Sequence, residues 1–445
     1  MADEGQVQVR FFTKQKRYSI QDIPFSIPAK ASQDELNSLI NGLLSQREDE
    51  NTESDEEMKG ELQFDFLIEN EFLQENIQKH MEAKKISTEN VVEIEYILKL
   101  QAPRPVNILV HDDWISSVSS CSGCILTGSY DNNVNIWNYQ GDCLSTYVGH
   151  SGPVKAVKWI SKDDKGGVIL SSSQDQSIRI SQWSSSTNEV HNVHICKGHS
   201  QSVDSISVDA SCTTFCSGSW DKTIKLWSAV LDPEASDEPD EEDGSSKKRQ
   251  KKNTTNKKAT TRTPLMTLSG HTQAVSSVVW MDKITICSAG WDHCIRVWDV
   301  VAGVNKQTLT GSKVFCSIAY SQLSYCLATG SADKFIRLWD PRIKDGQVVK
   351  GSLMSHQGWV SSLVWSPTSE FELASGSYDT TVRLWDTRSP YTPLYTMTEH
   401  QDKVMCIDWS KSKNVLSGGA DNQLIIYDVS AKSCKAPAQS EGDSQ

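Results

Sequence analysis

The sequence predicts a mainly β fold in which a small α+β region precedes a long repetitive region. Two observations predict it. A string close to "SGSWDKTIKLW" (217–227) returns several times, for example as "TGSYDNNVNIW" from Thr127 and "SGSYDTTVRLW" from Ser375. Residues 1 to about 100 lack this string and follow a different pattern of apolar positions. The two regions therefore need separate interpretations.

The leading region, residues 1–100, has strand patterns on both sides of a helix pattern. Runs of alternating or β-branched apolar residues predict the strands. They cover 7–12, 24–29, 62–68, a short segment near Leu73, and 90–98. A hairpin, then a helix, then further strands is the element order of a ubiquitin-like domain.

The helix pattern covers 32–44, "SQDELNSLINGLL". Ser32 and Glu35 have the S-x-x-E spacing of a capping box, in which each side chain binds a free backbone N–H of the first turn. The acidic stretch that follows, 47–60, predicts a disordered loop. Apolar residues fall at i, i+3, i+4, i+7 and i+8 on a single stripe: Leu36, Leu39, Ile40, Leu43 and Leu44.

The repeat has the length of a propeller blade. Its turn aspartates stand at 131, 175, 221, 292, 333, 379 and 421, so the spacings are 44, 46, 71, 41, 46 and 42 residues. The longest spacing contains a charged insert, 229–262, whose removal restores the period. A repeat of this length with a Trp-Asp signature is typical of propeller blades. Seven copies predict a seven-bladed β-propeller over 104–430.

Each repeat divides into four strands, as the fourth copy illustrates. The runs 274–280, 284–290 and 294–300 are interpreted as three consecutive strands. A tight turn that carries the aspartate joins the second strand to the third. The segment 265–271 and its counterparts supply the fourth strand and the corner into the next blade.

Four polar positions recur at fixed offsets from the turn aspartate. A Ser or Thr lies four residues before it in seven copies, an aromatic residue six after it in six, and a His 20 to 25 before it in six. Buried indole, hydroxyl, imidazole and carboxylate groups each need a hydrogen-bond partner. We therefore expect a Trp–Ser/Thr–His–Asp network in each blade, named here the blade clasp. Its candidate members are His111, Thr127, Asp131, Trp137, His199, Ser217, Asp221, Trp227, His271, Ser288, Asp292, Trp298, His356, Ser375, Asp379 and Trp385.

The same residue types form catalytic triads in enzymes. A triad occurs once in a chain, whereas this set recurs about seven times at a spacing that follows strand geometry. No phosphate-binding glycine loop or dinucleotide fingerprint appears. The sequence therefore predicts a protein that is not an enzyme and has no cofactor.

Two copies depart from the pattern. In the second, Ser181 stands where Trp is expected and Trp183 is displaced by two residues. In the fifth, Gly311 and Ser312 replace the Gly-His corner. We expect these two blades to be held less tightly.

The ends of the repeat region predict how the propeller closes. The last blade has a third strand at 423–429, but the tail, 431–445, is too polar to supply a fourth and is predicted to be disordered. The segment 105–110, "PVNILV", precedes the first blade and can fill that edge. Pairing the two ends removes the exposed edge of an open sheet.

The insert 229–262 is far longer than a blade needs, which indicates a functional or disordered segment. An acidic run in it is followed by "KKRQKK", which is typical of a nuclear import signal. A solvated charge run and contact with RNA phosphates are the alternatives, and strong salt dependence would mark the latter. The import residues are Lys247, Lys248, Arg249, Lys251 and Lys252.

Composition narrows the class of protein. No run approaches eighteen uncharged apolar residues, so no membrane span is expected. The start, "MADEGQVQVRFF", has no basic region leading into an apolar one, so no secretory signal is expected. A net charge of −13 argues against a protein that coats nucleic acid. The twelve cysteines form no tight framework, which favours reduced thiols in the cytosol or nucleus.

Two Cys/His groups are weak candidates for metal or redox chemistry. The "CSGC" motif (121–124) lies between two strands without a second pair, whereas a redox C-x-x-C opens a helix and zinc needs two further ligands. Near 191–199, His194 and Cys196 share a strand face while His191 points away. His199 already belongs to a blade clasp, so no intrinsic metal site is predicted.

Residues 104 to about 430 resemble a WD-repeat propeller, a fold that mostly serves as a rigid binding platform. The leading region adds "IPFSIPAKAS" (23–32), "FDFLI" (64–68) and "VVEIEY" (91–96). With "HDDWISSV" (111–118), these strings resemble the WD-repeat subunits of the pescadillo-containing complex, which matures the large ribosomal subunit. The related Notchless has a similar N-terminal domain but eight blades, so seven repeats favour the pescadillo-complex family.

The resemblance implies a non-enzymatic assembly factor that is required for large-subunit rRNA maturation and pre-60S particle formation. The implied partners are pescadillo, the second WD-repeat subunit as direct contact, the AAA ATPase midasin and pre-60S particles, with a possible indirect rRNA contact. The implied location is the nucleus, in nucleolus and nucleoplasm. A substrate receptor of a ubiquitin ligase, or a signalling scaffold, is the alternative function.

The resemblance also implies one site residue. In this family the N-terminal domain docks on the metal-ion-dependent adhesion site of midasin, where its carboxylate completes the coordination of the partner's Mg²⁺. Mg²⁺ favours hard oxygen ligands, which makes an exposed carboxylate suitable. The matching residue is Glu89, in the turn before the last strand, whereas Glu93 and Glu95 lie in that strand. ATP-driven force on this contact would strip the complex from the particle.

Overall fold

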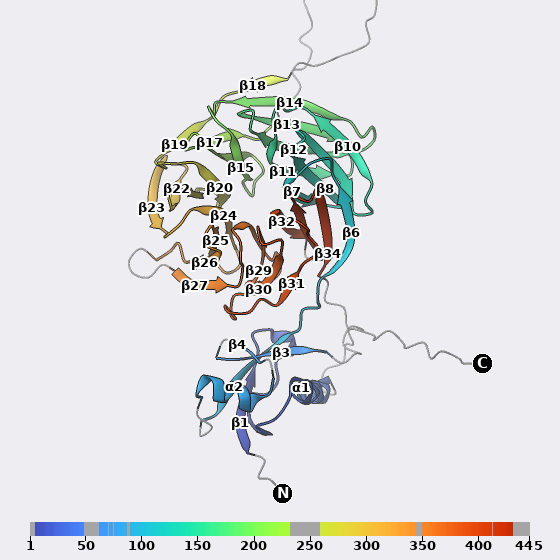
Figure 1. Ribbon diagram of the computed structural model, residues 1–445, viewed down its shortest axis with the longest axis vertical. Coiled ribbons are helices and arrows are strands. Elements are labelled where there is room, and N and C mark those ends of the chain that lie inside the picture. Colours follow the sequence, from blue (N-terminus) through green and yellow to red (C-terminus); the bar gives the residue numbers. More distant parts are fainter. Residues whose placement is uncertain are drawn as a thin grey trace, which may run out of the picture. The chain divides into compact units, whose positions relative to one another are not determined.

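The computed structural model describes residues 5–48, 62–69, 71–73, 75–86, 90–231, 259–343, 349–411 and 413–429. The chain divides into two compact units, formed mainly by residues 1–103 and 104–428. Each unit is considered by itself, with the element labels of Figure 1.

The first unit is a mixed five-stranded sheet with two helices. In chain order it contains β1 (Gln6–Phe12), a 3-10 turn (Lys16–Tyr18), β2 (Pro24–Pro28), α1 (Gln33–Glu48), β3 (Phe64–Ile68), β4 (Glu71–Phe72), α2 (Ile77–Lys84) and β5 (Val92–Leu98). The strand order is β2-β1-β5-β3-β4, with β1 and β5 parallel and the other neighbours antiparallel. Each predicted strand has a counterpart in this sheet.

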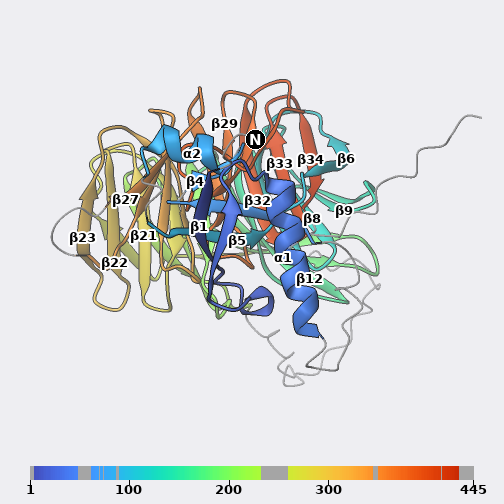
Figure 2. The same ribbon diagram turned by 90° about the horizontal axis from the view of Figure 1, so that it is seen from below.

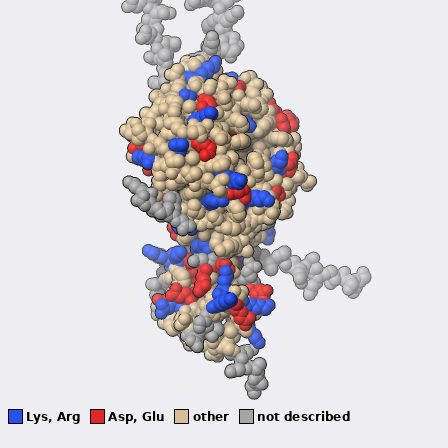
Figure 3. Space-filling model, turned by 60° about the vertical axis from the view of Figure 1, so that its left-hand side comes forward, with Lys and Arg blue, Asp and Glu red and all other residues tan. Residues whose placement is uncertain are grey.

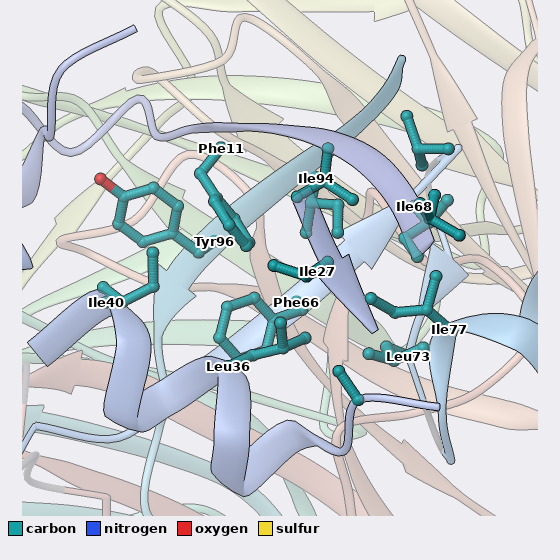
Figure 4. Packing of buried hydrophobic residues seen from close by; sticks show 14 of the residues in the cluster. Phe11, Ile27, Leu36, Ile40, Phe66, Ile68, Leu73, Ile77, Ile94 and Tyr96 are labelled. Carbon is teal, nitrogen blue, oxygen red and sulfur yellow. The ribbon is translucent and has the colours of Figure 1, made fainter. Parts of the chain in front are cut away.

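The core of this unit lies between the sheet and α1. Val9 and Phe11 are buried because alternate residues of β1 point to the same face. The stripe on α1 supplies Leu36 and Ile40, both fully buried, and Figure 4 shows Leu36 next to Phe66 of β3. The apolar periodicity of the predicted helix therefore marks its packed face.

Both helices begin at side-chain caps. The Ser32 N–H donates to the Glu35 carboxylate at 2.9 Å and the Glu35 N–H donates to the Ser32 hydroxyl at 3.4 Å, so the predicted capping box is confirmed. The sequence interpretation missed α2, although its Asn76 side chain accepts the Lys79 N–H at 2.8 Å. That helix ends at Lys85, which has a left-handed conformation.

The second unit is a ring of seven antiparallel blades, which Figure 1 shows face-on. Listed from the inner to the outer strand, blades 1 to 3 contain β7 (Ile115–Cys121), β8 (Cys124–Ser129), β9 (Asn133–Asn138) and β10 (Cys143–Val148); β11 (Val154–Asp163), β12 (Gly166–Ser173), β13 (Ser177–Ser184) and β14 (Val190–Lys197); and β15 (Val203–Val208), β16 (Thr214–Ser219), β17 (Thr223–Ser228) and β19 (Met266–Ser269). The predicted seven-bladed propeller is confirmed.

Blades 4 to 7 repeat this arrangement. They contain β20 (Val275–Trp280), β21 (Thr285–Gly290), β22 (Cys294–Asp299) and β23 (Val304–Thr310); β24 (Phe315–Tyr320), β25 (Leu327–Ser331), β26 (Phe335–Trp339) and β27 (Val349–Met354); β28 (Val360–Trp365), β29 (Glu372–Ser377), β30 (Val382–Asp386) and β31 (Tyr395–Met397); and β32 (Val404–Lys411), β33 (Asn414–Gly419), β34 (Gln423–Asp428) and β6 (Arg104–Val110). Figure 2 shows the strands of neighbouring blades side by side.

The ring closes through the two ends of the repeat region. β6 pairs antiparallel with β34, with Leu109 opposite Leu424, as the sequence predicts. The buried Asp408 carboxylate of blade 7 accepts the backbone N–H of Ser120 in blade 1 at 2.9 Å and its hydroxyl at 2.5 Å. The last blade is thus joined to the first by a strand pair and by side-chain hydrogen bonds.

The charged insert is shorter than the predicted disordered segment 229–262, and this is a correction. Ala229 is buried and donates its N–H to the Thr213 carbonyl at 2.8 Å. At the other end, β18 (Thr260–Arg262) pairs in parallel with β14 and adds a fifth strand to blade 2. Pairing with an outer strand satisfies backbone groups that a loop would leave to water. Residues 232–258 and the tail from 430 lie outside the described residues.

Candidate functional site

Three blades contain the full set of clasp contacts. In blade 3 the His199 ring lies 2.7 Å from Asp221 and 2.7 Å from Ser217, and the Trp227 N–H donates to the Ser217 hydroxyl at 2.8 Å. The matching distances in blades 4 and 6 lie between 2.7 and 3.0 Å. Each clasp ties the outer corner, the second strand and the third strand of one blade together.

The donors and acceptors of a clasp follow one direction. An indole N–H only donates, so Ser288 accepts from Trp298 and directs its own hydrogen to Nε2 of His271. The Nδ1–H of His271 then donates to Asp292. Burial lowers the pKa of His271, which the carboxylate of Asp292 only partly offsets. A neutral imidazole therefore satisfies every polar group of this set.

The clasp carboxylates are held in their ionised form. Burial alone raises the pKa of Asp221, but hydrogen bonds from His199 and Thr223 outweigh it and leave that pKa well below its usual value. The same balance lowers the pKa of Asp379 in blade 6. The clasp aspartates therefore stay charged throughout the physiological pH range.

The turn aspartate has a second structural role. In all seven blades its carboxylate accepts the backbone N–H two residues later, at 2.9–3.3 Å. The residue between them has a positive φ of 60–74° in every blade, for example Lys222 in blade 3. Aspartate favours such turns because its short side chain reaches its own backbone. One residue type therefore fixes both the turn and the imidazole.

Blade 1 corrects the prediction for Asp131. His111 lies 2.8 Å from Thr127, and Trp137 donates to Thr127 at 3.1 Å, but the Nδ1 atom of His111 has no partner. Asp131 holds the turn and does not bind His111. The residue after the histidine is Ser or Thr in blades 2 to 4 but Asp112 here, and a second carboxylate is unfavourable beside the first.

Blade 5 replaces its missing histidine with two other side chains. Arg337 donates to the Asp333 carboxylate at 2.6 and 3.1 Å, so the aspartate keeps a charged partner. The Phe315 ring packs against Gly311, where an added Cβ would collide with it. Trp339 still donates to Thr329 at 2.7 Å. The sequence contained both compensating residues, but the fixed offsets did not single them out.

Blade 2 replaces the volume of its missing tryptophan. Tyr147, from β10 of blade 1, packs its ring against Gly149, the side that the Trp298 ring occupies against Gly270 in blade 4. The buried hydroxyl of Ser181 has no hydrogen-bond partner. This junction is therefore filled, although its clasp lacks the indole N–H.

The weak Cys/His candidates gain no support. Cys121 and Cys124 face each other across the β7–β8 hairpin as free thiols, and burial raises the pKa of Cys124. His194 binds the Thr260 hydroxyl of β18 at 2.5 Å. Within the described ranges no three His, Cys, Asp or Glu side chains gather in an arrangement that could hold a metal ion. Over the same ranges no helix is long and apolar enough to cross a membrane.

Two sets of predicted site residues lie outside the described residues: Glu89, and Lys247, Lys248, Arg249, Lys251 and Lys252. The chain on either side of Glu89 is described. Ile86 and Asn90 line a cleft of about 610 Å³ in the first unit, with Phe12 of β1 and Val91, which is 48% exposed. The prediction for Glu89 therefore concerns a chain segment bordered by a partly apolar cleft.

Family models and relatives match both units. The NLE (NUC135) domain model matches residues 7–81. The WD domain, G-beta repeat model matches 103–138, 141–181, 191–228, 262–299, 303–340, 347–386 and 391–428. A ribosome biogenesis protein WDR12 homolog of Nematostella vectensis is 66% identical over 427 residues, which cover 96% of this chain and 100% of the relative.

The chain belongs to the WDR12 family of ribosome biogenesis proteins. WDR12 homologs of Ixodes scapularis and Drosophila virilis are 44% and 42% identical over 430 and 425 residues. These matches cover 96% and 95% of this chain, and 100% and 96% of the relatives. The WDR12 family therefore shares the NLE region and the propeller in one chain, and the predicted link to ribosome biogenesis is confirmed.

Proposed function

We propose that this protein is a non-enzymatic factor that assembles the large ribosomal subunit, and that it is required for rRNA maturation and pre-60S particle formation. The observation that carries the proposal is the 66% identity with a WDR12 homolog along both units. In blades 3, 4 and 6 the recurrent His, Ser and Asp side chains bind one another. They therefore serve the rigidity of a binding platform.

The propeller is proposed to hold the protein in the complex that contains pescadillo. Its direct contact is the second WD-repeat subunit, and any contact with rRNA is indirect. The work takes place in the nucleolus and nucleoplasm, which the protein enters through the basic run 247–252. The functional parts are a ubiquitin-like domain (1–100), the propeller (104–430) and the tail (431–445).

The first unit is proposed to be a handle that midasin grips. Its sheet order, with parallel β1 and β5 at the centre and α1 across one face, supports a ubiquitin-like domain of the Notchless type. Glu89 stands in the chain between α2 and β5. Its carboxylate would complete the coordination of the Mg²⁺ held by midasin, and ATP-driven force would then remove the complex from the particle.

A pull-down of the tagged full chain tests these assignments. We expect the wild-type chain to retain pescadillo, the second WD-repeat subunit, pre-60S proteins and midasin. The Glu89→Ala variant loses midasin but keeps the propeller partners, whereas Glu93→Ala, an exposed control on β5, keeps them all. Recovery of cullins or signalling proteins without pre-60S proteins would instead support a ligase receptor or scaffold.

A further inference from the structure

One end of the propeller carries a regular rim of paired residues. In every blade the residue before the turn aspartate donates its N–H to the carbonyl of the residue before the first strand, at 2.8–3.0 Å. Six of these fourteen rim residues are Trp or Tyr, types that anchor many protein interfaces. The donor and acceptor pairs are Tyr130 and Trp114, Gln174 and Pro153, Trp220 and Ser202, Trp291 and Ala274, Ala332 and Val314, Tyr378 and Trp359, and Ala420 and Lys403.

The rim of blades 1 and 2 contains a Trp–Tyr–Lys group. The Trp114 and Tyr130 rings meet edge-to-face with centroids 5.5 Å apart, and Trp114 is 41% exposed. The Lys155 ammonium lies 4.4 Å from the centroid of the Tyr130 ring and donates to its hydroxyl at 2.6 Å. A cation on an aromatic face gains electrostatic energy and loses side-chain freedom. This lysine is therefore already positioned beside an exposed indole.

The rim of blades 6 and 7 contains a second group of the same composition. Trp359 stacks on Tyr378 with centroids 5.8 Å apart and an interplanar angle of 12°. Trp359 is 44% exposed, and the Lys403 ammonium lies 5.6 Å from the centroid of the Tyr378 ring. Blade 7 adjoins blade 1 in the closed ring. The two groups therefore alternate along one arc, as aromatic pair, lysine, aromatic pair, lysine.

The lysines of this arc lack acidic partners. Within the described chain each ammonium contacts a tyrosine, and neither Lys155 nor Lys403 forms an ion pair with a carboxylate. An incoming carboxylate would find a cation whose side chain is already ordered, which lowers the entropic cost of binding. The arc therefore offers two anion contacts, each next to an exposed apolar ring.

The surrounding charges favour a protein segment over nucleic acid. The exposed Asp112 lies two residues before Trp114, and the exposed Asp402 precedes Lys403. Both carboxylates would repel a continuous phosphate backbone, whereas a peptide can carry its acidic side chains only where the lysines stand. Figure 3 shows lone charges of both signs on a mainly uncharged propeller surface, without a broad basic area.

We propose that the rim arc of blades 6, 7, 1 and 2 binds an extended acidic segment of a protein partner. Apolar or proline side chains of the segment pack on Trp114 and Trp359, and its carboxylates pair with Lys155 and Lys403. Aromatic anchors with flanking charge pairs are the usual source of affinity and specificity in such contacts. The rim can be tested with peptides alone, so its result does not depend on the role in ribosome assembly.

The test selects phage-displayed random 12-residue peptides on the immobilised full chain. We expect the selected peptides to be enriched in Asp and Glu next to Pro or large apolar residues. For the best synthetic peptide, fluorescence anisotropy should give a Kd at least about tenfold weaker with Trp359→Ala or with Lys403→Ala. The double variant Lys155→Glu/Lys403→Glu should select basic peptides, a gain that an unfolded protein cannot imitate.

Matched controls lie at the opposite ends of the strands. Lys283→Glu makes the same charge change in the exposed β20–β21 loop, and Tyr325→Ala removes a ring that is 54% exposed between β24 and β25. Both should leave the peptide Kd within about twofold. Selection without acidic enrichment, or equal peptides with wild type and the double variant, would overturn the proposal. So would rim-dependent binding of a 12-nucleotide poly(U) RNA with no peptide selected.

Discussion

The buried hydroxyls of the blade clasps form a graded series. Ser288 of blade 4 binds both His271 and Trp298. In blade 5, Thr329 binds Trp339 and no imidazole. The Ser181 hydroxyl of blade 2 is buried without any partner. If the clasps stabilise the propeller, removal of these hydroxyls should cost stability in this order.

The magnitude follows from the polar groups that each substitution leaves unpaired. A buried donor or acceptor without a partner costs about 1–3 kcal/mol. Ser288→Ala leaves two such groups and should lower the free energy of unfolding by about 2–6 kcal/mol. Thr329→Val keeps the side-chain shape and leaves one, so its cost is about 1–3 kcal/mol. Ser181→Ala leaves none and should lie within about 0.5 kcal/mol of wild type.

Urea unfolding of the full chain, followed by tryptophan fluorescence, measures these differences. All fourteen tryptophans lie at or beyond Trp114, so the signal reports the propeller and not the first unit. Equal losses for Ser288→Ala and Thr329→Val would contradict the reasoning. A loss with Ser181→Ala as large as that with Ser288→Ala would contradict it as well.

Three further changes test the fold. His271 and His356 have lowered pKa values in the folded protein, and burial is the largest cause. Unfolding therefore takes up protons below about pH 6.5, and the urea midpoint should fall from pH 7.5 to pH 5; a constant or rising midpoint would refute this. Phe315→Val should cost about 2–3 kcal/mol in the same titration, and adding Ser312→His should recover part of it; no loss would show that the ring fills no gap. Leu109→Asp, on the buried face of β6, should open the ring and speed proteolysis near residue 104, whereas Ile108→Asp, 48% exposed, should not.

The sequence could predict most of the fold because its signals are local and repeated. Each turn aspartate stands at a fixed distance from its hydroxyl residue, and strand geometry sets that distance. The closing strand was predictable because a propeller with a polar tail needs another strand for its last blade. Helix α2 was missed because its apolar positions, Ile77 and Met81, span only two turns.

Contacts between blades could not be read from the offsets. Tyr147 and Phe315 fill the two irregular blades from positions that no repeat pattern marks. The missing link between His111 and Asp131 depends on Asp112, a neighbour that the pattern ignores. The β18–β14 pair joins segments of different blades, and three residues carry too weak a strand signal to predict it.

The most direct test of the proposed handle is the binding of the full chain to the adhesion-site domain of midasin, measured by calorimetry with and without Mg²⁺. We predict binding that needs Mg²⁺, is lost with Glu89→Ala and is weakened with Glu89→Gln, because the neutral amide is a poorer Mg²⁺ ligand than a carboxylate. Glu93→Ala should bind like wild type. Equal affinities for the Glu89 variants and the wild type, or full affinity in a chelator, would contradict the account.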